Sequence, residues 1–214
     1  MPEEPFSQVW EEIYAYAKAS GIIVTAASGD AGSRGDGTMI KPDFPGSSPS
    51  VVSCGGTTLL CPTLEYSDGT TKETAWSLSG GGYSSLLPKP TWQARIDKRD
   101  VYRCSPDVCA VGDPETGVMY RIDDKWIVCG GTSVSSPVVA SFIAAAEGIT
   151  SAESLYSAHR LDPKAFNDII YGGNQDYDTD KGCDPVTGLG SISGAALVAA
   201  LSKVSYTHEV SPKG

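Results

Sequence analysis

Long apolar runs, basic residues and histidine are all scarce in this 214-residue chain. No run of 18 or more apolar residues occurs, so the sequence predicts no membrane-spanning helix. The first residues show no basic stretch followed by an apolar segment, the pattern that indicates a signal peptide. Lys and Arg number 16 against 26 Asp and Glu, which gives a formal net charge of -10. This acidic balance argues against nucleic acid or an anionic membrane as the main partner.

Sequence patterns for zinc and nucleotide sites are also missing. The six cysteines are Cys54, Cys61, Cys104, Cys109, Cys129 and Cys183. None of them has the Cys-x-x-Cys spacing of a zinc site. Disulfides, with Cys54 and Cys61 or Cys104 and Cys109 as local pairs, and reduced core thiols both remain open. The glycine loop 79–84 lacks the Gly-Lys-Ser/Thr of a phosphate-binding loop, so we expect no nucleotide site there.

The chain does contain an alternation of helical and short apolar segments. Residues 2–20 predict a helix with Phe6, Val9, Trp10, Ile13, Tyr14 and Ala17 on its apolar face and Glu11 and Glu12 on its solvated face. Residues 22–27 are a β-branched apolar run, typical of a strand buried in a parallel sheet.

Further segments continue this alternation. The expected strands are 50–54, 57–60 and 106–111, followed by a hairpin at 117–128 that turns at Asp123 and Asp124. The expected helices are 136–147 and 193–201, and a polar connection follows the first of them. With 40% hydrophobic residues the chain can bury a real core. These features predict an α/β fold and one domain over residues 1–214.

Two polar residues sit where such a fold places functional groups. Gly130-Gly131-Thr132-Ser133 precedes an alanine-rich helix with Pro137 near its first turn, which puts Ser133 at the helix N-terminus. Unpaired backbone N–H groups and the helix dipole there favour an alkoxide and the oxyanion it creates on a carbonyl. The alternative is that Ser133 or Ser135 is only an N-cap. Asp30 follows the strand 22–27 at its carboxyl end, as a site residue or as an Asx-turn residue.

The choice of catalytic base is narrow. His159 and His208 both follow Ser133, which excludes the Asp, His, Ser order of subtilisins. The sequence around Ser133 is not the Gly-x-Ser-x-Gly of α/β-hydrolases either. A serine activated without histidine needs a carboxylate, whose pKa near 4 makes it a competent base only in acid.

Seven motifs succeed one another along the chain. They are Ser28-Gly29-Asp30-Ala31-Gly32, Phe44-Pro45-Gly46-Ser47-Ser48-Pro49, Cys54-Gly55-Gly56-Thr57, Ser79-Gly80-Gly81-Gly82-Tyr83-Ser84, Pro106-Asp107-Val108, Gly130-Gly131-Thr132-Ser133 with Pro137, and Asp184-Pro185-Val186-Thr187-Gly188-Leu189-Gly190. In this order they resemble the motifs of the sedolisins, the serine-carboxyl peptidases related to subtilisin. The resemblance runs from about Glu3 to about Val204.

The resemblance implies a fold and an activity. The fold would be subtilisin-like, with a mostly parallel sheet flanked by helices in three α/β/α layers. The activity would be that of a serine endopeptidase that cleaves peptide or protein substrates at acidic pH. Ser133 would be the nucleophile, and Asp30 would be the carboxylic acid of the oxyanion hole, acting with the backbone N–H of Ser133. A carboxyl group donates a hydrogen bond to an oxyanion only when it is protonated.

The resemblance also implies one bound Ca²⁺ in a loop at about 166–190. Asp168, Ile169, Asp180, Gly182 and Asp184 map onto the family's ligands, as two carboxylates and three backbone carbonyls. With a water they would supply the six oxygens that calcium prefers. The chain departs from the family pattern here, with Asp180 in place of the usual glycine and Cys183 in place of the usual tryptophan. The alternative is a solvated Asp/Gly loop.

One part of the family pattern is missing. Sedolisins carry the catalytic base and its orienting acid as Glu-x-x-x-Asp, and no Glu in this sequence has an Asp four residues later. We therefore expect a chain truncated at its N-terminus relative to the family. Either an upstream segment or a separate chain supplies the Glu/Asp pair, or the chain is a catalytically incomplete remnant or split-enzyme half that serves as a calcium-stabilised binding or structural module. The spacing of Asp107 and Asp113 does not support either as a replacement base. The family suggests secretion or an acidic compartment, and the residues leave the compartment open.

Overall fold

A mixed sheet with mostly parallel strands organises the molecule. The computed structural model describes residues 7–35, 37–61 and 71–209. The strands of the sheet are β1 (Thr25–Ala27), β2 (Val52–Leu60), β3 (Lys72–Ala75), β6 (Val108–Val111), β9 (Phe166–Asn167) and β10 (Ser191–Ile192). Their order is β1-β2-β6-β10-β9, with β3 paired to β2. β1, β2, β6 and β10 are parallel to their neighbours in that series, whereas β3 and β9 are antiparallel to theirs.

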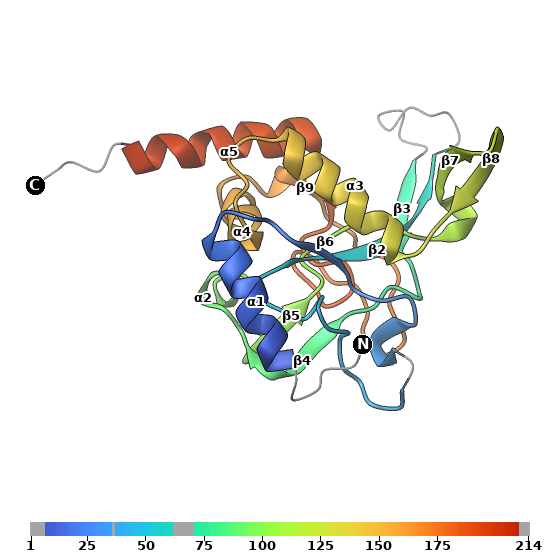
Figure 1. Cartoon of the computed structure of the whole chain (residues 1–214), viewed down its shortest axis with the longest axis horizontal. Coiled ribbons are helices and arrows are strands. Elements are labelled where there is room, and N and C mark those ends of the chain that lie inside the picture. The colour runs from blue at the N-terminus through green and yellow to red at the C-terminus, as the bar shows by residue number, and fades with distance from the viewer. Residues whose placement is uncertain (1–6, 36, 62–70, 210–214) are drawn as a thin grey trace, which may run out of the picture.

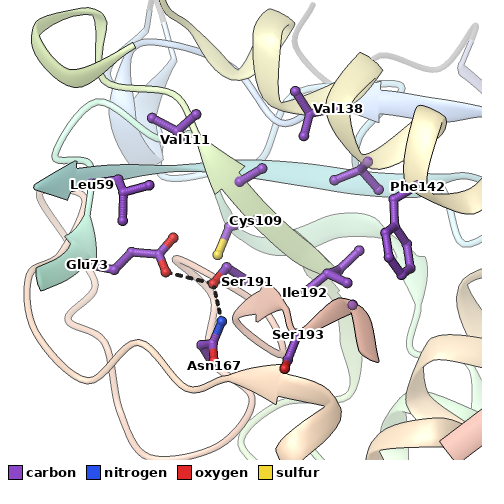
Figure 2. Close-up of a pocket in the computed structure, with 13 residues that line it drawn as sticks. Leu59, Glu73, Cys109, Val111, Val138, Phe142, Asn167, Ser191, Ile192 and Ser193 are labelled. Atoms are coloured by element: carbon purple, nitrogen blue, oxygen red, sulfur yellow. Dashed lines mark hydrogen bonds between the residues drawn. The ribbon is translucent and has the colours of Figure 1, made fainter. Parts of the chain in front are cut away.

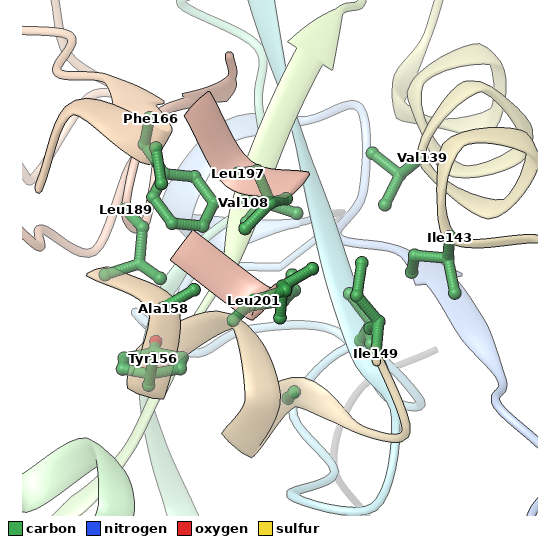
Figure 3. Packing of buried hydrophobic residues seen from close by; sticks show 14 of the residues in the cluster. Val108, Val139, Ile143, Ile149, Tyr156, Ala158, Phe166, Leu189, Leu197 and Leu201 are labelled. Atoms are coloured by element: carbon green, nitrogen blue, oxygen red, sulfur yellow. The ribbon is translucent and has the colours of Figure 1, made fainter. Parts of the chain in front are cut away.

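Helices flank this sheet, as predicted. They are α1 (Ser7–Ala19), α2 (Thr91–Ala94), α3 (Thr132–Ala145), α4 (Ala152–Leu161) and α5 (Gly194–Glu209). In Figure 1 α3 lies above β2 and α1 below it. Val139 and Ile143 are four residues apart on α3, so both face the core, where they meet Val52 of β2 and Val108 of β6. Figure 3 shows this core closing against α4 and α5.

The apolar face predicted for the first helix is wrong in part. The exposed side chains of α1 include Val9, Trp10 and Ile13, at 62%, 45% and 50%. Tyr14 instead packs on Phe44, with ring centroids 5.9 Å apart. Glu11, expected in solvent, accepts a hydrogen bond from the Ser50 hydroxyl at 2.6 Å, while Glu12 is exposed as predicted. The helix is oriented by these tertiary contacts, which periodicity in the sequence does not reveal.

Four other elements differ from the sequence expectations. β2 is one strand through Gly55 and Gly56 rather than two runs, because the missing side chains admit Pro106 and Trp76. The expected polar connection contains α4, whose buried positions are Ala152, Leu155, Tyr156 and Ala158. These residues recur at helical spacing. α3 begins at Thr132 and so encloses Pro137, and α5 extends to Glu209.

Two further strand pairs stand outside the main sheet. β4 (Gly82–Pro88) pairs with β5 (Tyr102–Ser105), and β7 (Val118–Ile122) pairs with β8 (Lys125–Cys129). The second pair is the predicted hairpin, with positive φ values of 47° and 60° at Asp123 and Asp124. All six cysteines are free thiols, so neither local disulfide is formed. No helix among the described residues has the length and apolar character to cross a membrane.

Candidate active site

The turn between β8 and α3 is built from two glycines. Gly131 precedes the first residue of α3 with a φ of 96°, a conformation that residues with a side chain rarely adopt. A Cβ at this position would lie 2.6 Å from Oδ2 of Asp30. Glycine therefore lets a carboxylate from a distant loop approach the start of the helix.

Asp30 and Thr132 connect that loop to the helix. Oδ1 of Asp30 accepts hydrogen bonds from the backbone N–H and from the hydroxyl of Thr132, both at 2.6 Å. The Thr132 hydroxyl in turn accepts from the backbone N–H of Gly29 at 3.1 Å. The Asp30 side chain thus bonds across the fold to a residue 102 positions away, and not within its own loop as an Asx-turn residue would.

Ser133 follows Thr132 as an exposed residue of the first helical turn. Its hydroxyl has no hydrogen-bond partner among the described residues. The Ser135 hydroxyl accepts from the backbone N–H of Ala110 at 3.0 Å and so holds α3 on β6. Neither serine caps the helix, because the residue at the N-cap position is Gly131. The structure therefore brings Asp30 and the start of Ser133's helix together and leaves the Ser133 hydroxyl accessible.

Other titratable groups considered as bases are engaged elsewhere. The Asp107 carboxylate is fully buried and accepts from Arg103 at 2.6 Å. Asp113 accepts from the hydroxyl of Thr58 at 2.7 Å. His159 packs on the ring of Phe166, and its burial lowers the pKa of the imidazole. None of these groups contacts Ser133.

A second contact fixes the loop that carries Asp30. Asp176 accepts hydrogen bonds from the Ser33 hydroxyl at 2.5 Å and from two nitrogens of Arg34 at 2.6 and 2.8 Å. The hydrogen bond from Arg34 is the main reason why the pKa of Asp176 is lowered to about 2. Nothing local in the sequence predicts this ion pair or the bond between Thr132 and Asp30, because both join segments more than 100 residues apart.

The glycine loop 79–84 lies against the same segment. The backbone N–H of Gly80 donates to the carbonyl of Gly29 at 2.7 Å. A Cβ on Gly80 would lie 2.1 Å from the carbonyl oxygen of Ser28. Gly80 thus allows one backbone to approach another and thereby supports the loop that carries Asp30.

The residues expected to bind calcium lie in two segments, 168–169 and 180–184, that hydrogen bonds join. Both carboxylate oxygens of Asp168 are within 3.1 Å of the Gly182 backbone nitrogen, which donates to them. Asp184 is fully buried and accepts from the backbone N–H groups of Val186 at 2.9 Å and Asp180 at 3.2 Å. Burial raises the pKa of Asp184 to about 6 against the opposing effect of these donors.

The carboxylates of Asp168 and Asp184 are oxygen donors of the kind that a hard cation prefers. In this structure backbone N–H groups of Gly182 and Asp180 donate to them. Ile169, the third residue of the set, is 2% exposed and anchors its segment in the core. Across the described part of the chain, no group of three or more His, Cys, Asp or Glu side chains is arranged to hold a metal ion.

Known proteins resemble this chain in sequence. No family model matches it. Kumamolisin of Bacillus sp. (strain MN-32) is 35% identical, over 86% of this chain and 37% of its own length. Sedolisin of Pseudomonas sp. (strain 101) is 31% identical, over 94% of this chain and 38% of its own length. Human tripeptidyl-peptidase 1 is 29% identical, over 86% of this chain and 38% of its own length. The chain thus spans little more than a third of the length of these relatives.

Solved structures give a matching comparison. Pseudomonas sedolisin, a serine-carboxyl proteinase complexed with two molecules of pseudo-iodotyrostatin, superposes with a TM-score of 0.83 at 30% identity. The superposition covers 92% of this chain and 60% of that one. Sphericase superposes with a TM-score of 0.58 at 16% identity, over 90% of this chain and 54% of its own, which shows a likeness of fold.

Proposed function

Because this chain belongs to the sedolisin family of serine-carboxyl peptidases and has their subtilisin-like fold, we propose that it carries the nucleophile and the oxyanion-binding acid of a serine endopeptidase active in acid. Ser133 is the nucleophile and Asp30 the acid. The observation that carries this assignment is the Asp30 carboxylate held at the N-terminus of α3, beside an accessible Ser133 hydroxyl. Its substrates are peptides or proteins, as for its peptidase relatives.

The hydrogen bonds of Asp30 suggest which oxygen carries the catalytic proton. Oδ1 already accepts two hydrogen bonds from Thr132 at 2.6 Å, so a proton on that oxygen would be repelled by the two donor hydrogens. The proton of the neutral acid therefore resides on Oδ2, the oxygen that lies over Gly131 at the helix start. From there it donates to the oxyanion together with the backbone N–H of Ser133. An ionised Asp30 would instead repel the oxyanion, which confines activity to acid.

Activation of Ser133 requires a base from outside the described contacts. The sequence holds no Glu-x-x-x-Asp pair, and Asp107 and Asp113 are committed to other partners. We assign the base to an upstream segment of a longer protein or to a separate chain. A serine centre deprived of its base loses several orders of magnitude in rate, so the chain without that segment has little or no activity.

The second candidate is a non-enzymatic module. In that case the chain keeps the fold and the calcium loop as a binding or structural unit. The observation behind it is that the given residues contain no Glu-x-x-x-Asp pair. Retention of both Ser133 and Asp30, with Asp30 hydrogen-bonded to the residue before Ser133, favours the peptidase.

Hydrolysis of a quenched-fluorescent peptide pool from about pH 3 to about pH 7 separates the two, because carboxylates titrate over this range. For the peptidase, activity in acid disappears in Ser133→Ala and persists in the control Ser141→Ala, an exposed serine two turns further along α3. Asp30→Asn carries an amide that donates at every pH, so any remaining activity no longer falls as the pH rises through the carboxyl range. Because the chain alone lacks the base, the assay uses the chain completed with a segment that carries the Glu/Asp pair. No hydrolysis by that folded, completed chain supports the module.

We also propose that the loop 166–190 holds one Ca²⁺. Asp168 and Asp184 would bind it through their carboxylates, and Ile169, Asp180 and Gly182 through their carbonyls. The bound ion would supply positive charge that stabilises the buried Asp184 carboxylate. Calcium then raises the melting temperature of the chain and a chelator lowers it, whereas Asp184→Asn abolishes the difference. Asp124→Asn, in the exposed turn of the β7–β8 hairpin, leaves it unchanged.

A further inference from the structure

A cavity separate from the candidate active site lies along α3, away from the N-terminus of this helix. Figure 2 shows a cavity between this helix and the β3, β6 and β10 strands. Its volume is about 500 Å³, within the range of small-molecule sites. Val138 and Phe142 of α3, Leu59 of β2, Val111 of β6 and Ile192 of β10 form apolar walls. Nothing in the proposed peptidase chemistry uses it.

One end of the cavity is polar and fixed by hydrogen bonds. Oε2 of Glu73 accepts from the Ser191 hydroxyl at 2.7 Å, and the Ser191 oxygen accepts from the Asn167 amide at 3.2 Å. Oε1 of Glu73 accepts from the Thr57 hydroxyl at 2.8 Å. A network of hydrogen bonds from residues of β2, β9 and β10 therefore holds the Glu73 carboxylate of β3 in one position. A ligand can bind to this carboxylate without rearranging it.

The charge of the lining has one sign. Glu73 is the charged residue among the described lining residues, which include no Lys, Arg or His. The Cys109 thiol lies at the same end in Figure 2, and burial raises its pKa well above the ordinary value, so it stays neutral. A carboxylate at the end of an apolar cavity attracts a cation that carries an apolar chain, and repels an anion of the same shape.

We propose that this cavity binds a small aliphatic amine, with its ammonium group at Glu73 and its chain along Val138 and Phe142. A chain of about six carbons fits within this volume and leaves room at the mouth. Each methylene that enters the apolar part strengthens binding about fourfold. Neither Ser133 nor Asp30 lines the cavity, so the proposal can be tested independently of the peptidase assignment.

Titration of the chain with n-hexylamine, followed by NMR of the protein, tests the proposal. Saturable binding is expected, with shifts confined to the cavity residues. n-Butylamine should bind about fifteenfold more weakly, because it lacks two methylenes. Hexan-1-ol should bind at least tenfold more weakly, and hexanoate should not bind. Equal affinity for hexylamine and hexanoate, or no saturation by hexylamine, overturns the proposal.

Two variants locate the site. Glu73→Gln keeps the shape and one acceptor oxygen, replaces the other acceptor by an N–H donor and removes the charge, so amine affinity falls at least tenfold while hexanol binding is unchanged. Glu147→Gln removes the same charge from an exposed position beyond the end of α3 and has no effect. Val138→Phe fills the mouth from a side chain that is 42% exposed, and weakens binding of amine and alcohol alike without disturbing the core. Unchanged binding in Val138→Phe refutes the location even if Glu73→Gln fails to fold.

Discussion

Thr132 is the residue whose replacement most directly tests how the candidate site is held together. Thr132→Val keeps the shape of a fully buried side chain and removes its hydroxyl. Two hydrogen bonds then disappear, one to Oδ1 of Asp30 at 2.6 Å and one from the N–H of Gly29 at 3.1 Å. The second leaves a partly buried donor without its partner.

The expected loss follows from these two bonds. A hydrogen bond to a carboxylate contributes about 1.5 kcal/mol at the lower end of its range, which applies because Asp30 is exposed to water. The Gly29 bond adds about 0.5–1 kcal/mol. Thr132→Val should therefore lower the free energy of unfolding by about 2 kcal/mol and the melting temperature by about 4–8 °C. Thr132→Ser keeps both bonds and loses only a methyl group near Gly56, at a cost of about 1 kcal/mol.

Urea unfolding of the two variants and the parent chain measures the difference, and Asp30→Ala completes a double-mutant cycle. A coupling of at least about 1 kcal/mol between Thr132→Val and Asp30→Ala is expected. If Thr132→Val is as stable as Thr132→Ser, or if the two losses simply add, the hydroxyl does not hold the carboxylate and the reasoning fails.

Three further changes probe the contacts around the site. Asp176→Asn removes a group whose folded pKa, about 2, lies below the unfolded value near 3.9, so its contribution is complete above about pH 4 and is lost as the pH falls through about 2. The melting temperatures of parent and variant should therefore differ at pH 5 and converge near pH 2, and a constant gap contradicts this. Arg103→Met leaves Asp107 buried without its cation and should cost about 3–5 kcal/mol in urea unfolding; a loss below about 1 kcal/mol argues against a buried ion pair. Gly131→Ala places a Cβ 2.6 Å from Asp30 Oδ2 at a φ of 96° and should cost about 2 kcal/mol, whereas an unchanged melting curve contradicts the close approach.

Local chemistry made the architecture predictable. The β-branched run before Asp30, the hairpin with two aspartates at its turn and the glycine pair before Thr132 each specify their structure within a few residues. The same locality explains the errors. α1 turns Trp10 outward because Tyr14 finds Phe44, a partner 30 positions away, and α4 was hidden by polar residues on its exposed side.

In the candidate site, too, features encoded by neighbouring residues could be predicted and features that depend on distant contacts could not. The placement of Ser133 at a helix start depends on adjacent glycines and could be predicted. The bond from Thr132 to Asp30 and the ion pair from Arg34 to Asp176 depend on folding across more than 100 residues, so no local pattern encodes them. The cavity at Glu73 combines residues from five strands and two helices, and it too becomes visible only in three dimensions.

The bond between Thr132 and Asp30 also bears on when the chain could become reactive. It closes a loop of 102 residues, and the entropic cost of that closure is offset by the packing of α3 on β1, β2 and β6. Contacts of such sequence separation are slow to form and belong to the late stages of folding. With the roles proposed above, a nascent or partly folded chain would present Ser133 without the Asp30 donor, and the topology would delay reactivity until folding is nearly finished.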